Sequence, residues 1–294
     1  MIWQKRWFQF TIMMILAFIW GSSFILMKIG LKSFSSDQAA AIRIFLASLV
    51  LLPTSLRQIK KLQRKDLLSL MIVGFIGSLI PAFLFMQAET RINSSMAGML
   101  NSLTPVFTLI VGLLFHKSVF KWLQVLGLSF GLAGAVGLII AGEGFHLGPF
   151  NFYTLLIVLA TIFYAFSMNQ IKTYLSHLTG VQVTSLSFLF IGPVALIYLL
   201  TTNFTPIVAN PGWPIHLLAL ATLGILGTAL AMLLMNSLIR NSSAVSASSV
   251  TYIIPIFAII WGLLDNEKVT LLHLICMTLI LSGVYLINRK SLKL

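Results

Sequence analysis

The sequence predicts an all-α membrane protein with ten transmembrane helices, arranged as two five-helix halves in a 5+5 inverted-topology repeat. Three observations predict this fold: the composition, the recurrence of long apolar stretches, and matched positions in the two halves. The 294 residues are 59% hydrophobic and 9% charged, with a mean hydropathy of +1.01. A soluble domain carries about 25% charged residues. The composition therefore excludes a water-soluble enzyme, a disordered chain and a fibrous repeat.

Ten apolar stretches are long enough to cross a lipid bilayer as helices. A helix needs about 20 apolar residues to cross a hydrocarbon core of about 30 Å. None of the stretches shows the alternation expected of a β-barrel strand. The segments between them are too short to form a separate domain, so we expect the function to lie within or beside the bilayer. The expected spans are residues 8–27, 39–56, 67–88, 95–115, 122–141, 152–173, 181–201, 215–239, 244–264 and 271–288.

Basic residues distribute unequally between the two faces of this arrangement. With the N-terminus and every second loop on one face, 14 of the 19 lysine and arginine residues lie on that face and 5 on the other. By the positive-inside rule, both termini are cytoplasmic and the protein is a multi-pass protein of the inner, or cytoplasmic, cell membrane. Topology thus accounts for the net charge of +13, and we expect no nucleic-acid partner.

The sequence carries no motif for a bound cofactor or metal. Its one cysteine, Cys276, excludes an intramolecular disulfide and a cysteine-based metal site. There is no His-Glu-x-x-His, no glycine-rich phosphate loop with lysine and no Gly-x-Ser-x-Gly. We therefore expect no cofactor, no metal site and no catalytic residues.

The chain repeats itself at an offset of about 150 residues. Trp20 aligns with Tyr164 and Lys28 with Lys172, at an offset of about 144. We divide the chain into two repeats, residues 1–143 and 144–294. The matched segments are Gly74-Phe75-Ile76-Gly77 with Gly224-Ile225-Leu226-Gly227, Asn93-Ser94-Ser95 with Asn241-Ser242-Ser243, and Pro105-Val106-Phe107 with Pro255-Ile256-Phe257.

An odd number of helices in each half inserts the two halves in opposite orientations. Two such bundles can exchange conformations and open a midplane site to each side of the membrane in turn. The repeat therefore predicts a secondary transporter that moves a small solute by alternating access. Two other interpretations stay open: a passive channel or lipid scramblase, and a membrane-embedded enzyme, which the missing catalytic motifs disfavour.

Several short motifs resemble those of a known family. The chain is similar over its whole length to the EamA branch of the drug/metabolite transporter superfamily. The resemblance implies export of amino acids or related metabolites, sometimes of drugs, and a possible homodimer. The motifs are Trp20-Gly21-Ser22-Ser23-Phe24 followed by Lys28, Arg43-Ile44-Phe45-Leu46-Ala47, the Pro-x-Phe segments at Pro105 and Pro255, and Asp265-Asn266-Glu267-Lys268-Val269-Thr270, which resembles Gly-Glu-x-x-Thr.

Two departures from the family pattern fall in loops. His116-Lys117-Ser118 stands where the repeat predicts a counterpart of Glu267, and Asp265-Asn266 replaces the usual small residue and glycine.

Two prolines at depth give the strongest local signal for a site. Pro105 frees the carbonyl of Asn101, and Pro255 frees that of Thr251, because proline has no N–H to bind the carbonyl four residues earlier. In hydrocarbon, such a carbonyl must be met by a neighbouring helix, a hydroxyl, water or a ligand. We therefore expect both helices to bend here. Their equivalent places in the repeat favour a substrate cavity over two unrelated kinks.

Polar and aromatic side chains near these bends, or in other spans, are the candidate substrate-binding residues. Polar side chains in membrane helices usually face the bundle interior, where each could instead join two helices. Trp20 and Tyr164 could form flat cavity walls or belong to the interfacial belt. The candidates are Trp20, Gln87, Asn101, Thr104, Tyr164, Asn169, Asn236, Thr251 and Tyr252, with Pro105 and Pro255 as helix-kink residues.

We expect the cavity to be uncharged. The six acidic residues and five histidines fall in loops or near span ends. Proton relays commonly use such groups at depth, so any proton coupling should be weak or absent. Arg43 lies inside a span, where it could attract an anionic group or extend to the interface. An amide, hydroxyl and aromatic lining suits a zwitterionic or moderately apolar solute.

The Gly127 and Gly131 pair permits close helix packing.

Overall fold

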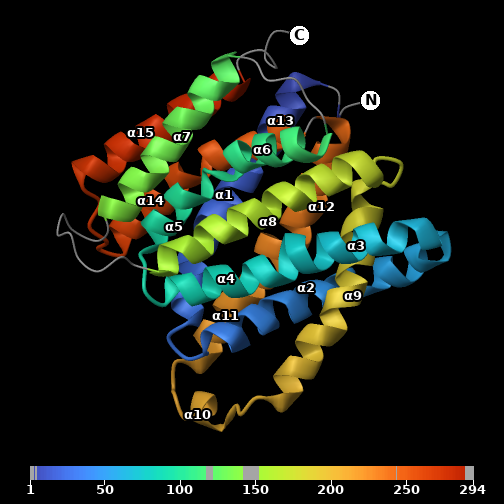
Figure 1. The fold of residues 1–294 in the computed structure, drawn as a ribbon. Helices are drawn as coiled ribbons and strands as arrows, with labels where there is room; N and C mark the ends of the chain where they lie inside the picture. Colours follow the sequence, from blue (N-terminus) through green and yellow to red (C-terminus); the bar gives the residue numbers. More distant parts are fainter. Residues whose placement is uncertain (1–2, 4, 117–121, 142–151, 243, 289–294) are drawn as a thin grey trace.

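The computed structural model describes residue 3 and residues 5–116, 122–141, 152–242 and 244–288, and these residues contain helices and no strand (Figure 1). Eight helices are long and apolar enough to cross a membrane, and two shorter apolar helices, Val250–Leu264 and Leu271–Leu286, follow them. The all-helical membrane fold is thus confirmed. The boundary predicted at residues 143–144 lies outside the described residues. The eight long apolar helices are Trp7–Gly30, Ser36–Gln58, Arg64–Glu89, Ser94–Phe115, Trp122–Ile140, Phe152–Tyr174, Gly180–Thr201 and Trp213–Asn241.

Helices α2 (Ser36–Gln58) and α9 (Gly180–Thr201) begin with the same capping box and pack against each other. The side chain of Ser35 caps α2 and that of Thr179 caps α9, each reciprocated by a glutamine three residues later. A Cβ added to Gly192 would lie 2.5 Å from the Cβ of Ser48. The two helices therefore approach so closely at this crossing that α9 requires a glycine there.

Two matched helices each contain a π-helical segment. In one, α3 (Leu67–Gly74) continues through Phe75–Leu79 into α4 (Ile80–Glu89). In the other, α11 (Trp213–Gly224) continues through Ile225–Leu230 into α12 (Ala231–Asn241). Both segments begin directly after a glycine of the matched Gly-x-x-Gly pairs. Such π-helical turns often occur at functional sites.

Two further spans are interrupted next to their prolines. The first divides into α5 (Ser94–Asn101) and α6 (Thr104–His116). The second divides into α13 (Ala244–Ser248), a 3₁₀ segment (Ser249–Tyr252) and α14 (Ile254–Leu264). Pro105 and Pro255 each lie in the first turn of the helix that follows the break, where a missing N–H is tolerated. The remaining elements are α1 (Arg6–Gly30), α7 (Trp122–Ala141), α8 (Phe152–Tyr174), α10 (Thr205–Val208) and α15 (Leu271–Asn288).

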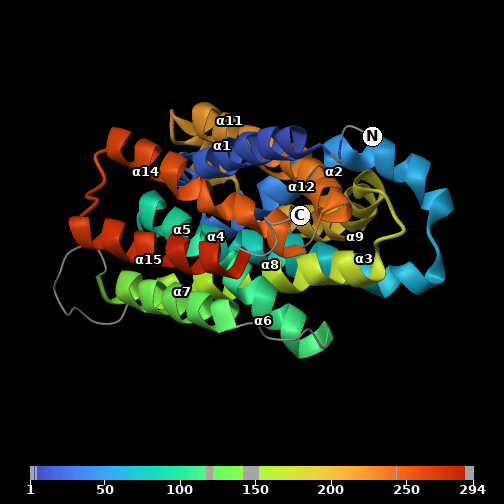
Figure 2. The same ribbon diagram turned by 90° about the horizontal axis from the view of Figure 1, so that it is seen from above.

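The glycines of α7 pack against α15 and, at Gly131, also against Val106 of α6 within the same chain. Figures 1 and 2 show the two helices side by side. A Cβ added to Gly134 would lie 2.5 Å from the carbonyl oxygen of Cys276, and one added to Gly131 would lie 2.7 Å from a methyl of Val106. The small residues of this helix thus serve close packing inside the bundle, as the Gly-x-x-x-Gly spacing suggests.

Replacing Gly134 with alanine is expected to lower the thermal unfolding temperature of the detergent-solubilised protein by several degrees. The new Cβ would meet backbone of α15, which cannot rotate away, and overpacking costs about 1–3 kcal/mol. Val136→Ala is the matched control because Val136 is exposed on the same helix. Equal unfolding temperatures for the two variants would contradict this packing role.

Candidate functional site

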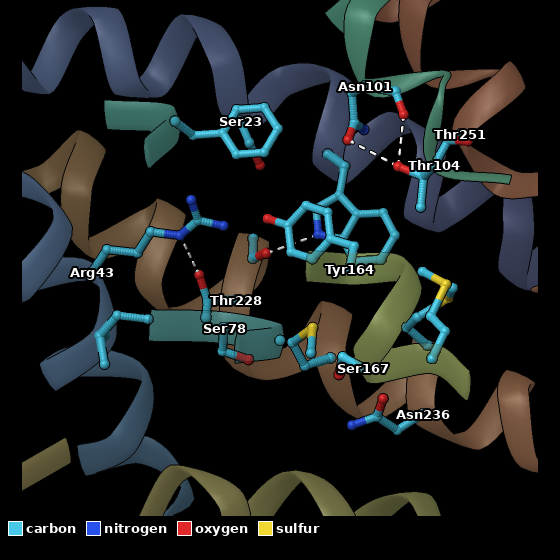
Figure 3. A pocket seen from close by; sticks show the side chains of 18 of the residues that line it. Ser23, Arg43, Ser78, Asn101, Thr104, Tyr164, Ser167, Thr228, Asn236 and Thr251 are labelled. Carbon is cyan, nitrogen blue, oxygen red and sulfur yellow. Dashed lines mark hydrogen bonds between the residues drawn. The ribbon is translucent and has the colours of Figure 1, made fainter. Parts of the chain in front are cut away.

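A cavity lies where the interrupted helices and the π-helical segments meet, and residues of both sequence halves line it (Figure 3). It encloses about 80 Å³, which is room for a few water molecules or a small organic group. Its walls come from α1, α2, α4, α5, α6, α8 and α12, both π-helical segments and the 3₁₀ segment before α14.

Hydroxyl groups bind both carbonyls that the prolines leave without a helical partner. Thr104 Oγ1 donates to the carbonyl of Asn101 over 2.8 Å, within the first break. Ser102 Oγ donates to the carbonyl of Thr251 over 3.0 Å, from the first break to the second. Because a free carbonyl in a bilayer is costly, these bonds stabilise two irregular backbone segments beside the cavity.

Six of the nine candidate substrate-binding residues line this cavity. They come from five different spans and include two of the three aromatic candidates, Trp20 and Tyr164. The indole Nε1 of Trp20 donates to the carbonyl of Gly227 over 3.0 Å, which fixes the ring against the second π-helical segment. The six are Trp20, Asn101, Thr104, Tyr164, Asn236 and Thr251.

The other three candidates lie outside the cavity lining and bind neighbouring helices. Gln87 Oε1 accepts a hydrogen bond from Ser36 Oγ. The side-chain amide of Asn169 donates to the carbonyl of Thr108 over 3.0 Å. The hydroxyl of Tyr252 donates to the carbonyl of Val284. Sequence polarity marks an inward-facing residue but does not say whether it meets a cavity or a neighbouring helix.

Four small hydroxyl residues of the cavity follow the repeat but were missed by the sequence analysis. Ser23 and Ser167 occupy equivalent positions of α1 and α8, and each lies against a π-segment glycine. Ser78 and Thr228 are equivalent residues of the two π-helical segments. The matched spacing could have identified them, because Ser23 and Ser167 share the offset of 144 that relates Trp20 to Tyr164. Ser78 and Thr228 share the offset of 150 that relates the glycines before them.

Arg43 makes the expectation of an uncharged cavity wrong. Its side chain lines the cavity and the residue is only 8% exposed. Nε donates to Thr228 Oγ1 over 2.6 Å, and Nη1 lies 3.9 Å from the sulfur of Met27. The guanidinium therefore turns inward instead of extending to the interface, because packing of α2 against α11 directs this face of α2 into the bundle.

Glu267 joins α1, α5 and the loop after α14 at one end of the bundle. Its Oε1 accepts from Lys28 Nζ and from the Ser94 N–H, both over 3.0 Å. Its Oε2 accepts from the N–H of Ser95 over 2.9 Å and from its Oγ over 2.7 Å. Lys28 also pairs with Asp265 at 2.5 Å. The carboxylate thus caps the N-terminus of α5, where the helix dipole favours negative charge.

The local sequence after α14 brings Glu267 into this position. Asn266 adopts a positive φ of 61°, the left-handed conformation that asparagine tolerates better than most residues. It thereby replaces the glycine of the family pattern. Burial by itself raises the pKa of Glu267, but the hydrogen bonds from Ser95, Lys28 and Ser94 outweigh burial and hold the pKa below its usual value.

Lys172, the counterpart of Lys28 in the second half, has different partners. Its Nζ donates to the carbonyls of Ile239, Arg240 and Ser242 at the end of α12. A cation is favourable at the C-terminus of a helix. The position matching Glu267 in the first half falls at Lys117, which lies outside the described residues. Equivalent lysines therefore bind carboxylates at one end and backbone carbonyls at the other.

The sequence model of the EamA-like transporter family matches residues 7–140 and 151–289, which together cover most of the chain. The chain belongs to the EamA-like transporter family. The match occurs twice, once in each half, as the internal repeat predicts. Membership confirms the resemblance found in the sequence and makes this protein a membrane transporter by family.

Curated relatives agree with membership in the EamA-like family. The uncharacterized inner membrane transporter YedA of Escherichia coli K12 is 27% identical, over 92% of this chain and 87% of its own length. The probable terminal-alkyne amino-acid exporter of Streptantibioticus cattleyicolor is 23% identical, over 93% of this chain and 91% of its own length. The S-adenosylmethionine/S-adenosylhomocysteine transporter of Chlamydia trachomatis serovar L2 is 23% identical, over 84% of this chain and 78% of its own length.

One solved crystal structure shares the overall fold. It superposes with a TM-score of 0.69 at 15% identity and covers 98% of this chain and 99% of its own. Together with the spans, the relatives place this EamA-like protein in the inner membrane. They also support a transporter instead of an enzyme at the level of the family.

Replacing Glu267 with glutamine is expected to destabilise this EamA-like protein at neutral pH, by about 1.5–3 kcal/mol for the lost charged hydrogen bonds. The folded-state pKa of Glu267 lies below its unfolded value, so its stabilisation is present above the unfolded pKa and is lost as pH falls through the folded pKa. The unfolding temperatures of wild type and E267Q should therefore approach each other as the pH is lowered.

Lys268→Gln provides the control for this pH dependence. Lys268 is exposed in the same loop, and its replacement should leave both the unfolding temperature and its pH profile close to those of wild type. If the unfolding temperatures of wild type and E267Q instead differ by a constant amount across the acidic range, ionisation of the Glu267 carboxylate does not cause the difference in stability.

Proposed function

We propose that this chain is a secondary transporter, and specifically an exporter, of small organic solutes such as amino acids or related metabolites. It moves them across the cytoplasmic membrane by alternating access. The observation that carries the proposal is the cavity at the meeting point of two proline breaks and two π-helical segments, with walls from both sequence halves. Irregular backbone at membrane depth is tolerated where it lines a cavity, and transporters bind their solutes at such places.

The proposed architecture is a ten-span inverted repeat with both termini in the cytoplasm and with halves 1–143 and 144–294. Reciprocal contacts between the halves support it. A Cβ on Gly74 would lie 2.8 Å from the Ser187 carbonyl, and one on Gly224 would lie 2.9 Å from the Arg43 carbonyl. Residues 43 and 187 share the offset of 144 that relates Lys28 to Lys172. Matching contacts in both directions are expected of two halves related by a two-fold axis.

The names of two relatives support the solute class. One is a probable exporter of a terminal-alkyne amino acid and the other a transporter of S-adenosylmethionine and S-adenosylhomocysteine. Both names denote small solutes that contain an amino-acid group. The cavity presents amide, hydroxyl, aromatic and thioether side chains, which suit a polar head attached to an apolar body. We propose the same six candidate residues that line the cavity as its solute contacts.

Counterflow in proteoliposomes tests the mechanism. We expect L-amino acids that raise the unfolding temperature of the purified protein also to accelerate, from the opposite side, the uptake of their labelled forms. Only a carrier with alternating access shows this exchange. Asn101→Ala should reduce it, because Asn101 lines the cavity, whereas Ser129→Ala, at an exposed site on α7, should not. Uptake that solute on the opposite side does not accelerate would indicate a channel. Chemical alteration of the solute during incubation would indicate an enzyme.

Collapse of the pH gradient is expected to leave uptake unchanged at a fixed solute gradient. The described residues that line the cavity include no aspartate, glutamate or histidine, and proton-coupled carriers commonly relay protons through such groups. The measurement is labelled uptake with and without a protonophore. Abolished uptake would show that transport is coupled to protons.

A further inference from the structure

The cavity contains a cation that the protein itself does not neutralise. Arg43 is 8% exposed, and its guanidinium contacts a neutral hydroxyl, that of Thr228, and a neutral sulfur, that of Met27. The ion pairs of the described residues involve Lys28 and His177, and none involves Arg43. In Figure 3 the guanidinium points into the cavity and faces Tyr164. Donor capacity thus remains for a group inside the cavity, since guanidinium has five N–H donors.

A buried cation without a carboxylate partner is costly, and more so in a membrane helix. Such a group is rare within membrane spans and usually marks a substrate or ion pathway. Hydrogen bonds to neutral groups compensate only part of the lost hydration. Arg43 therefore has a function that offsets this cost, either in packing or in ligand binding.

The internal repeat separates these two roles. Ser187 of α9 is the counterpart of Arg43 in α2, because each presents its carbonyl to the matched glycine of the other half, Gly74 or Gly224. The same crossing is therefore built with a small neutral side chain in one half and a long cationic one in the other. Helix packing at this position does not require arginine, which leaves ligand binding as its role.

Two polar atoms of the cavity lack a partner as well. Asn236 is 1% exposed, and its amide nitrogen donates to Thr184 Oγ1 over 2.9 Å, while its Oδ1 has no hydrogen-bond partner. Ser78 Oγ is also buried without a partner. Both residues line the cavity, and Figure 3 shows Asn236 well apart from Arg43. Buried polar atoms are normally satisfied, so a ligand that supplies donors and acceptors here would complete the site.

We propose that Arg43 binds the carboxylate of the transported solute, and that Asn236 Oδ1 accepts from an N–H or O–H group elsewhere on the same molecule. The guanidinium fork matches a carboxylate in two parallel hydrogen bonds. The solute is thus an organic carboxylate with a separate donor group, not a cation or an uncharged drug. This inference rests on the proposed transport function and narrows its solute class.

Binding by paired probes tests the proposal. Unfolding temperatures of wild type are measured with a panel of L-amino acids and with the carboxamide of each, which retains the side chain and the amine but lacks the carboxylate. We expect the acids to bind about 10- to 100-fold more tightly, the range of a hydrogen bond to a charged group. Equal binding of acids and carboxamides, or no binding of any acid, would overturn the proposal.

Arg43→Ser inserts the residue of the equivalent position and should abolish the preference for acids. Its ligand-free unfolding temperature should match or exceed that of wild type, because an uncompensated buried charge has been removed. Arg43→Lys keeps the charge without the fork and should bind acids with intermediate affinity. Arg57→Ser is the matched control, since Arg57 is exposed on the same helix, and it should retain the preference.

The outcomes distinguish this proposal from the transport function. Ligand-free R43S and R43K that both unfold well below wild type would show that Arg43 stabilises the bundle, and would overturn the proposal. Retention of the acid preference in R43S would do the same. Counterflow of carboxamides or amines without counterflow of acids would leave the transporter intact and remove the carboxylate site. Absence of counterflow with every probe would instead count against the transport function.

Discussion

Backbone carbonyls that lose their helical N–H partner must find a donor inside the protein when lipid surrounds it, and this constraint shapes the centre of the bundle. Thr104 supplies a donor to Asn101 within the first helix break. Ser102 supplies one to Thr251 across the bundle. The second bond holds the breaks of the two halves against each other. The second break therefore depends on the first half for its donor, whereas the first break satisfies its own carbonyl.

The halves correspond in packing but differ in charge. Capping boxes, glycine contacts and π-helical segments occur in both, because the same helix crossings require them. Polar chemistry diverges at equivalent positions: Arg43 corresponds to Ser187, and Lys28 binds carboxylates whereas Lys172 binds carbonyls. A solute bound in the cavity, as proposed, would therefore meet different groups on its two sides. The two ends of the bundle are held by different interactions.

The cavity and the end of the bundle near Glu267 differ in how they affect stability. Around the cavity, unpaired polar atoms of Asn236 and Ser78 and the buried guanidinium of Arg43 lower stability. At the end near Glu267, ion pairs and a capped helix N-terminus hold α1, α5 and the loop after α14 together. Alternating access, as proposed, would require the contacts around Glu267 to separate while the polar groups of the cavity bind the solute.

The sequence by itself determined the all-helical membrane fold, the family and the positions of the helix breaks. Hydrophobicity and proline act locally, and a bilayer leaves few ways to satisfy a backbone. Only the tertiary structure decided which polar residues share the cavity. Trp20 and Asn236 line it, whereas Asn169 binds a neighbouring helix, and the direction in which Arg43 points depends on how α2 packs. A side chain's orientation around its helix is set by contacts with distant segments, which a linear pattern of polar residues does not contain.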